Sequence, residues 1–290
     1  MYGLADYLDR RRSIIRFLEE DIGAGDITTN SIIPADKMVN AVIRCNESKE
    51  TITCGLHEAQ IVFDICNCKA ILFINDGSEI KKDNIVMHIR GGARSVLKAE
   101  RTALNIIMRM SGIATLTRSF VAQAEKYDPK VKITGTRKTA PGLRFFDKKA
   151  ITIGGGYPHR MRLDDMVLIK DNHLAISDSI EKTIRMAKDN LGSAVRIECE
   201  VKDTEEAIRA AKAGANVIMF DNFTPSEAEV GVKKVRELEA FDDIEIELSG
   251  GITLDNIIEY VKAQPDLISV GQLTHSPPAV DYSLDIVNNM

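Results

Sequence analysis

The stretch MVLIKDNH, residues 166–173, begins with four apolar side chains and ends in a lysine, a carboxylate, an amide and an imidazole. Five other stretches share this form, an apolar β-rich run that finishes in a charge, a hydroxyl or a glycine. They are VKITGTRK (131–138), RIECEV (196–201), NVIMFDNF (216–223), IEIELSGG (244–251) and LISVGQLTH (267–275). The run ends lie 33, 30, 21, 28 and 22 residues apart when they are marked by Arg137, Lys170, Glu200, Asp221, Ser249 and Gly271. A βα unit has this length, because parallel strands need a long crossover connection.

Successive βα units predict a (β/α) barrel, whose strands share one face at their carboxyl ends, and that face carries the active site. Six runs are clear rather than the eight of a complete barrel, so we expect an incomplete or distorted barrel. Helix signals lie between the runs. Asp203-Thr204 can cap a helix that Gly214 ends, Thr224-Pro225 can start the next, and Thr253 can cap another.

The residues before about 115 have a different pattern. Short β-like runs cover 39–45, 51–54, 70–75 and 84–89, and helical periodicity marks the first 20 residues, 57–65 and 93–110. This part reads as an α+β domain, and the whole chain as an α/β protein.

Composition narrows the class of protein. The chain has 290 residues with 44% hydrophobic and 28% charged side chains, which suits a globular protein with a sizeable core. Its net charge of −5 argues against a general nucleic-acid binder, and no apolar run is long enough to cross a membrane. The five cysteines lack metal or redox spacing, so we expect them to be reduced and mostly buried, in a cytoplasmic protein.

Positive charge is concentrated in one region of this acidic chain. Residues 137–170 contain eight Lys or Arg against three Asp, a local charge of +5. Such a run is often only a solvated surface. Here Arg137, Lys138 and Lys170 stand at run ends, and His159-Arg160 follows a glycine-rich turn, so the region suits a small polyanion.

Glycines and carboxylates mark the rest of the predicted barrel mouth. The Ser249-Gly250-Gly251 turn and the segment from Gly271 to His275 either form tight βα turns or bind a phosphate on backbone N–H groups. Glu200 and Asp221 either pair with lysines, hold Mg²⁺, or stabilise a developing cation on a sugar. His173 is also expected at the mouth.

Ten motifs follow one another with the order and spacing of the quinolinate phosphoribosyltransferase family, which the chain resembles over nearly its whole length. They are GDITT (25–29), ERTALN (100–105), SGIAT (111–115), TRKTAPGLR (136–144), GGGYPHRMRLDD (154–165), LIKDNH (168–173), ECEV (198–201), FDNF (220–223), LSGGI (248–252) and VGQLTHS (270–276). The resemblance implies an N-terminal α/β sandwich domain (1–115), an incomplete α/β barrel with the active site (116–275) and a C-terminal segment that returns to the first domain (276–290).

The resemblance also implies a reaction and an assembly. Quinolinate and phosphoribosyl pyrophosphate would react with Mg²⁺ to give nicotinate mononucleotide, pyrophosphate and CO₂, in de novo NAD biosynthesis. The enzyme would be a homodimer with shared active sites, or a hexamer of dimers.

The family's functional residues fall on matching positions of this chain. Its quinolinate-binding positions correspond to Arg101, Arg137, His159, Arg160 and Lys170, with Lys138 at the dicarboxylate or the pyrophosphate and Arg101 reaching a partner subunit's site. Glu200 and Asp221 match its acidic pair near the ribose and Mg²⁺, although Glu198 remains an alternative to Glu200. Its phosphate-side positions correspond to Ser249, Gly250, Gly271 and His275.

Three other readings stay open on sequence alone. Lys170 could be the amine of a Schiff-base lyase, if it were desolvated and deprotonated. The chain could be a ModD-like paralogue that binds another anion. It could also be a nicotinate phosphoribosyltransferase, although the full set of cations favours a dicarboxylate.

Overall fold

The structure is a computed structural model that describes residues 4–192, 194–238 and 243–287, with side chains from residue 7 onward. The chain divides into two compact units. The first comprises residues 1–116, 140–154 and 277–290, and the second comprises residues 117–139 and 155–276. The segment 140–154 belongs to the first unit by its contacts, although it falls inside the range predicted for the barrel domain.

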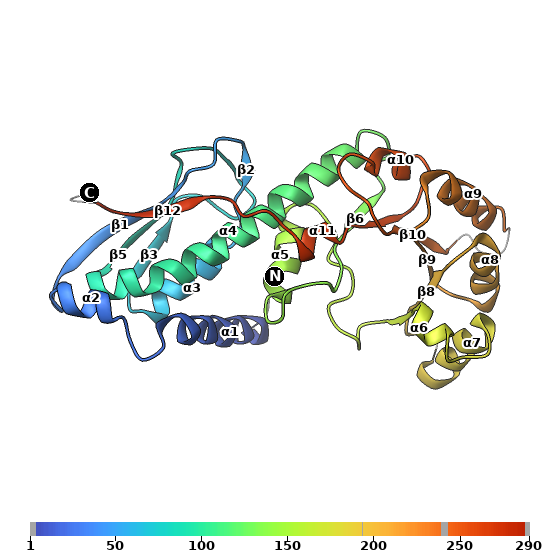
Figure 1. Ribbon diagram of the computed structural model, residues 1–290, viewed down its shortest axis with the longest axis horizontal. Coiled ribbons are helices and arrows are strands. Elements are labelled where there is room, and N and C mark those ends of the chain that lie inside the picture. The colour runs from blue at the N-terminus through green and yellow to red at the C-terminus, as the bar shows by residue number, and fades with distance from the viewer. Residues whose placement is uncertain (1–3, 193, 239–242, 288–290) are drawn as a thin grey trace. The chain divides into compact units, whose positions relative to one another are not determined.

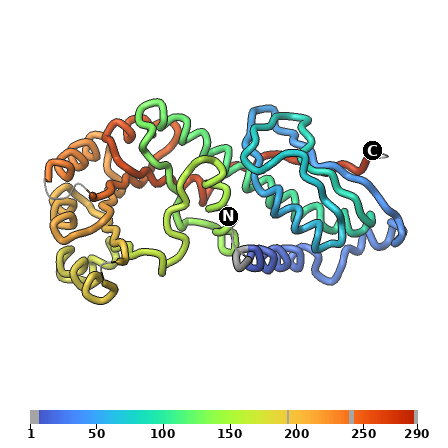
Figure 2. The backbone as a smooth tube through the Cα atoms, turned by 180° about the vertical axis from the view of Figure 1, so that it is seen from behind, coloured from blue at the N-terminus to red at the C-terminus, as the bar shows by residue number. Residues whose placement is uncertain are grey.

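The first unit is built on a four-stranded antiparallel sheet in the order β12-β1-β5-β3. Its strands are β1 (Met38–Cys45), β3 (Lys69–Leu72), β5 (Ile85–Gly92) and β12 (Tyr282–Val287), and a small second sheet pairs β2 (Thr51–Ile52) with β4 (Glu79–Ile80). The C-terminal strand β12 lies beside β1, near the start of the chain (Figure 2).

The first unit also contains helices, of which α3 and α4 run beside the sheet (Figure 1). The helices are α1 (Leu4–Ile22), α2 (Ile27–Ile32), α3 (Leu56–Ile65), α4 (Ala93–Ala124) and α5 (Arg144–Ile153). The helix α4 is longer than the predicted 93–110 and continues past the change of pattern near residue 115. Gly112 makes a close contact possible, since a Cβ atom there would lie 1.8 Å from the carbonyl oxygen of Pro278.

The second unit is the predicted open barrel. Its six parallel strands are hydrogen-bonded in the order β6-β11-β10-β9-β8-β7, and β6 and β7 form the two edges within the described residues. The strands are β6 (Lys132–Thr134), β7 (Val167–Ile169), β8 (Ile197–Val201), β9 (Val217–Asp221), β10 (Glu245–Ser249) and β11 (Leu267–Ser269). Their apolar side chains are almost fully buried, which explains the continuous hydrophobic runs in the sequence.

Helices follow the strands of the second unit. They are α6 (Asp171–Leu174), α7 (Ile180–Leu191), α8 (Thr204–Ala213), α9 (Pro225–Arg236), α10 (Ile257–Val261) and α11 (Gln272–His275). Figure 1 shows α7, α8, α9 and α10 outside the strands. No helix in the described ranges combines the length and apolarity needed to span a bilayer.

Two of the predicted helix starts are confirmed. The Asp203 side chain caps α8, which ends at Gly214, and Thr224 caps α9 with Pro225 as its first residue. The prediction for Thr253 is wrong, because α10 begins only at Ile257 and the intervening residues form a turn. The described cysteines are all free, and four of the five are buried, as expected.

Candidate functional site

The strands are shorter than the runs predicted from the sequence. The polar residues that finish each run therefore lie at the end of a strand or just beyond it. The strand β7 stops at Ile169, so Lys170 is the first residue beyond it, and Asp171 to Leu174 form the short helix α6 rather than more strand. His173 accepts the Lys170 backbone N–H on Nδ1 at 2.9 Å, which closes this turn. His173 therefore has a local structural role at the mouth.

Lys170 and Glu200 form an ion pair across neighbouring strands. The lysine Nζ lies 2.5 Å from Glu200 Oε2, and the two side chains are 45% and 12% exposed. The Lys170 Nζ is thus engaged by a carboxylate, whereas the nucleophile of a Schiff-base lyase must be a free amine. The geometry therefore disfavours the lyase reading.

Glu198 and Glu200 both point into the barrel, because residues two apart on a strand share a face. Glu200 lies nearer the carboxyl end of β8 and pairs with Lys170, whereas Glu198 lies deeper and is fully buried. The sequence posed these two residues as alternatives; they occupy successive depths of one barrel interior.

Two arginines lie near each other at the mouth. Arg137 is three residues beyond the end of β6, and its buried Nε has no hydrogen-bond partner within the described residues. Burial first, and then the positive charge of Arg137, lower the pKa of Arg160. An unsatisfied buried donor beside a second guanidinium is an arrangement that an anion would stabilise.

His159 contacts two buried glutamates. Its Nε2 lies 3.0 Å from Glu247 Oε2 and 3.3 Å from Glu198 Oε2, and both carboxylates are 0% exposed. Its Nδ1 accepts the backbone N–H of Arg160 at 2.8 Å. The ligand atoms of the three side chains lie within 4.8 Å of one another, the spacing of a possible metal cluster.

Burial and the two carboxylates act in opposite directions on the pKa of the His159 imidazole. Burial lowers the pKa of His159, but Glu198 and Glu247 outweigh burial and raise it to about 9. Burial, followed by the charge of Glu247, also raises the pKa of Glu198. The Arg160 amide N–H points at Nδ1, so the hydrogen-bond geometry places a ring proton on Nε2, facing the two carboxylates.

Glycines in close contact with neighbouring residues form the other side of the mouth. Gly250 and Gly251 have φ angles of +95° and +61°, and a Cβ on Gly250 would lie 2.3 Å from Asn222 Oδ1. A Cβ on Gly271 would lie 3.1 Å from the His275 ring and 3.9 Å from Lys138 Cδ. Glycine at 250 is thus required by the left-handed backbone and by the close approach of Asn222, and at 271 the His275 ring packs where a larger side chain would lie.

Asp221 lies beside this turn at the end of β9, in register with Ser249 on β10. Its Oδ2 accepts a hydrogen bond of 2.7 Å from Asn222 Nδ2, and the Asn222 backbone N–H donates to Ser249 O at 2.8 Å. A pocket of about 550 Å³ opens next to Asp221 and Asn222 between the first turns of α8 and α9, and its lining includes neither Arg137 nor Lys170. Asn222 and Glu247 are contact residues that the sequence did not single out; Glu247 could have been noticed as a charge inside an apolar run.

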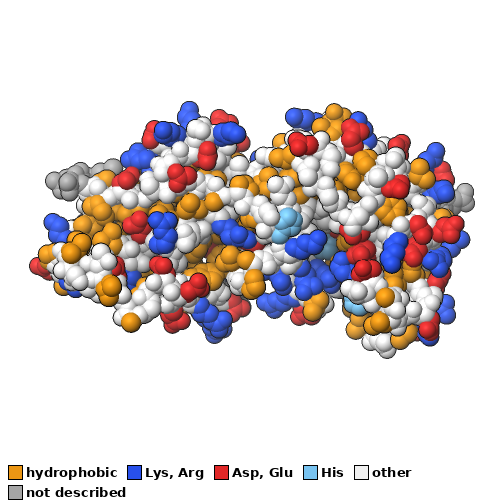
Figure 3. All heavy atoms as spheres, in the orientation of Figure 1, with side chains coloured by type: hydrophobic (Ala, Val, Ile, Leu, Met, Phe, Trp, Pro, Cys, Tyr) orange, Lys and Arg blue, Asp and Glu red, His pale blue; other side chains and the backbone are white. Residues whose placement is uncertain are grey.

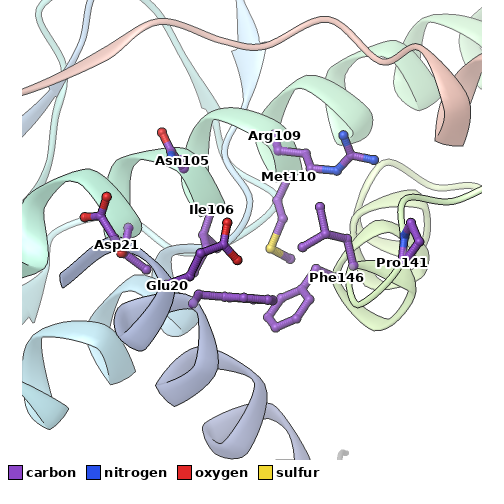
Figure 4. Close-up of a pocket in the computed structure, with 11 residues that line it drawn as sticks. Glu20, Asp21, Asn105, Ile106, Arg109, Met110, Pro141 and Phe146 are labelled. Atoms are coloured by element: carbon purple, nitrogen blue, oxygen red, sulfur yellow. The ribbon is translucent and has the colours of Figure 1, made fainter. Parts of the chain in front are cut away.

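The first unit has a different pocket, of about 460 Å³ (Figure 4). Its one arginine, Arg109, donates from Nε and Nη2 to Asp147 at 2.7 and 2.9 Å, so its fork is already engaged. Arg101 lies exposed on α4 of this unit. Its expected contact with a partner subunit's site stays a prediction.

The contacts above join the predicted site residues of the second unit in separate groups, such as Lys170 with Glu200, Arg137 with Arg160, and Asp221 with Ser249. Figure 3 shows basic and acidic side chains mixed over the face in view, with one concentration of Lys, Arg and His. The arrangement can bind a multiply charged anion and has carboxylates beside it.

Comparison with known proteins agrees with this geometry. The chain matches the sequence models of the N-terminal domain (residues 26–111) and the C-terminal domain (residues 113–285) of quinolinate phosphoribosyl transferase. It is 45% identical to a probable nicotinate-nucleotide pyrophosphorylase [carboxylating] of Methanocaldococcus jannaschii, over 93% of this chain and 94% of that protein. It is 36% identical to the human nicotinate-nucleotide pyrophosphorylase [carboxylating], over 78% and 75%.

A solved structure shows the same fold. The nicotinate-nucleotide pyrophosphorylase from Francisella tularensis superposes with a TM-score of 0.87 at 33% identity, covering 96% of each chain. The open barrel with its charged mouth, together with these matches, defines an enzyme of the phosphoribosyltransferase class. The chain belongs to the quinolinate phosphoribosyltransferase family.

Proposed function

We propose that the protein transfers the phosphoribosyl group of phosphoribosyl pyrophosphate to quinolinate, with loss of CO₂, in the biosynthesis of NAD. The products are nicotinate mononucleotide and pyrophosphate. The observation that carries this proposal is the buried Nε of Arg137, which has no hydrogen-bond partner in the described part of the chain, beside the guanidinium of Arg160. Quinolinate has two adjacent carboxylates on a pyridine ring, and a pair of arginine forks complements them.

The residues of the mouth act by position and charge. Lys170 and the arginines hold the dicarboxylate, and the glycine turns at Gly250 and Gly271 leave room for the phosphates of the second substrate. When pyrophosphate departs, the ribose gains positive charge, which the Glu200 and Asp221 carboxylates stabilise. The pyridine nitrogen then attacks the ribose, the resulting ring cation stabilises the electron pair left on the adjacent carbon as CO₂ departs, and that carbon takes up a proton from solvent. The mechanism requires no covalent enzyme intermediate.

The carboxylates also fit a magnesium ion. Within the described ranges, Glu200 and Asp221 each use one oxygen in a side-chain hydrogen bond and leave the other available. Mg²⁺ binds to proteins through one or two carboxylates together with waters and substrate phosphates. Bound there, it would neutralise charge on the leaving pyrophosphate.

The decisive test is incubation of the purified protein with phosphoribosyl pyrophosphate, Mg²⁺ and either quinolinate or nicotinate. We expect CO₂ and mononucleotide in equal amounts from quinolinate, no product from nicotinate, and loss of activity with a chelator that excess Mg²⁺ restores. Mononucleotide from nicotinate without CO₂ would instead identify a nicotinate phosphoribosyltransferase. Binding of another anion without turnover would favour the ModD-like reading.

We further propose a homodimer in which the exposed Arg101 of one subunit completes the partner's site. If so, Arg101→Ala and Lys170→Ala proteins are each inactive, but a mixed dimer has one intact site. Mixing them after brief dissociation should restore about a quarter of normal activity, because half the dimers are hybrids with one working site each. Sedimentation of the same samples measures the assembly. A monomer, or a mixture that stays inactive while hybrids form, refutes the shared site.

A further inference from the structure

His159 has both ring nitrogens engaged by the protein. Nε2 lies 3.0 Å from Glu247 Oε2, and Nδ1 accepts the Arg160 amide at 2.8 Å. An imidazole offers only these two hydrogen-bonding atoms. In this arrangement none remains for a substrate, although the side chain lies at the edge of the mouth and is 12% exposed.

The glutamates that contact His159 are themselves fixed. Glu247 Oε1 accepts a hydrogen bond from Ser269, and the Ser269 hydroxyl lies 2.8 Å from Thr134 Oγ1. This chain of hydrogen bonds joins β10, β11 and β6 inside the barrel. Glu198 approaches from β8, and neither of its oxygens makes a hydrogen bond within the described residues. Two fully buried carboxylates cost free energy unless they act on a partner, and the shared partner is the His159 ring.

The backbone of His159 is held in an unfavourable conformation. Its φ angle is +54°, in the left-handed region that residues other than glycine rarely adopt. Such a conformation persists when surrounding contacts enforce it. The glutamates at Nε2 and the Arg160 amide at Nδ1 hold the His159 ring and therefore its backbone. They also fix the direction in which the chain continues into Arg160.

We propose that Glu198, Glu247 and His159 form a buried clamp that orients the backbone of Arg160, and that His159 is a positioning residue rather than a hydrogen-bonding ligand of the substrate. The clamp holds the Arg160 guanidinium near Arg137 at the mouth. The role of the clamp in substrate binding rests on the proposed function, in which these arginines bind the pyridine dicarboxylate.

A metal ion is the rival occupant of the three side chains. Zinc or a related ion would bind a bare Nε2, and Nδ1 would then carry the proton and donate it. Here the Arg160 N–H points at Nδ1, which leaves the proton on Nε2, facing the carboxylates. The ring geometry therefore favours a hydrogen-bonded clamp over a metal centre.

The first test needs no activity. In protein labelled with ¹⁵N-histidine, the His159 signals, assigned by their loss in a His159→Asn variant, should report a protonated Nε2 and an unprotonated Nδ1 that accepts a hydrogen bond. Glu247→Leu should shift these signals, and Glu247→Gln should shift them less, because the amide oxygen can still accept. A bare Nε2, or one equivalent of bound metal that Glu247→Leu removes, overturns the clamp.

The second test asks whether the clamp acts through Arg160. Calorimetric titration should show that Glu247→Leu weakens quinolinate binding about tenfold or more, the scale of one charge-assisted hydrogen bond, with a smaller loss for Glu247→Gln. In an Arg160→Ala background the same change should have an effect of less than about twofold. Glu245→Gln, on the same strand but paired with Arg196, is the matched control and should bind normally.

The outcomes separate the two proposals. Effects of Glu247→Leu and Arg160→Ala that multiply in the double variant would show that the clamp does not work through Arg160. If quinolinate fails to bind the unmodified protein, the proposed function is wrong, while the nitrogen signals still decide whether the clamp exists. If Glu247→Leu does not fold, Glu247→Gln supplies the same comparison.

Discussion

Replacing Lys170 by alanine should lower kcat/KM for quinolinate by about a thousandfold or more, the scale for losing a charged group aimed at a reacting centre. The change removes a cation from the mouth and leaves Glu200, which lies 2.5 Å from Nζ, without its partner. A free carboxylate then repels both anionic substrates. Steady-state kinetics with each substrate varied in turn measure the loss.

Folding should survive this change. The Lys170 side chain is 45% exposed, and half-exposed ion pairs contribute at most about 1 kcal/mol to stability. Thermal unfolding should therefore shift little. Lys212→Ala, an exposed lysine at the end of α8, is the matched control and should keep normal kinetics. Near-normal turnover in Lys170→Ala would remove Lys170 from the site.

The second large effect concerns stability rather than activity. Lys149 on α5 is 6% exposed and lies 2.8 Å from Glu58 and 3.0 Å from Asp76, which are 0% and 5% exposed. Burial lowers the pKa of Lys149, but the two carboxylates outweigh burial and raise it. Lys149→Ala should cost about 3–5 kcal/mol, because it leaves the buried Asp76 without its cation and takes one of two cations from Glu58, which keeps Arg10 at 3.0 Å.

Urea unfolding followed by circular dichroism measures this loss. Lys149→Met keeps the apolar stem, so it should separate lost charge from lost packing. Adding Asp76→Asn to Lys149→Met should restore part of the stability, since it removes the carboxylate that has lost its cation. Lys82→Ala, an exposed lysine of the same unit, should unfold like the unmodified protein. A Lys149→Ala midpoint equal to that of Lys82→Ala would show that the buried ion pairs contribute nothing.

The order of the barrel strands could be predicted because each one carries its own signal. Strands β8, β9 and β10 are buried on both faces, so their hydrophobic runs are continuous and stand out from the intervening helices. The caps at Asp203 and Thr224 are equally local, since the capping side chain bonds to a backbone N–H three residues later. Thr253 failed as a cap because a turn with an Asn256 side-chain contact comes first.

The assignment of α5 to the first unit could not be predicted from a local sequence signal. Residues 140–154 follow a barrel strand in sequence, yet the ion pairs of Asp147 with Arg109 and of Lys149 with Glu58 join them to the first unit. These partners are 38 and 91 residues away. A sequence pattern records the charges but not which distant charge each one meets.

The residues of the candidate site also fall into two groups, those that a local sequence signal predicts and those that only distant contacts reveal. Lys170 and Asp221 follow directly from strand ends, and the resemblance supplied His159 and Arg160. The inward glutamates were harder, because Glu198 and Glu247 interrupt apolar runs deep in the barrel and do not stand at the mouth. Their significance becomes visible only when three separate segments meet at one imidazole.

The open edge of the barrel has an evolutionary consequence. Between β6 and β7 the ladder is interrupted, and the chain from 158 to 166 runs there without strand pairing. An insertion or deletion in a paired strand would shift its register against the neighbouring strands. In the unpaired segment 158–166, natural variation can change the side chains that contact a ligand while the register of the paired strands is kept. New substrate specificities in such proteins should therefore arise first in this segment.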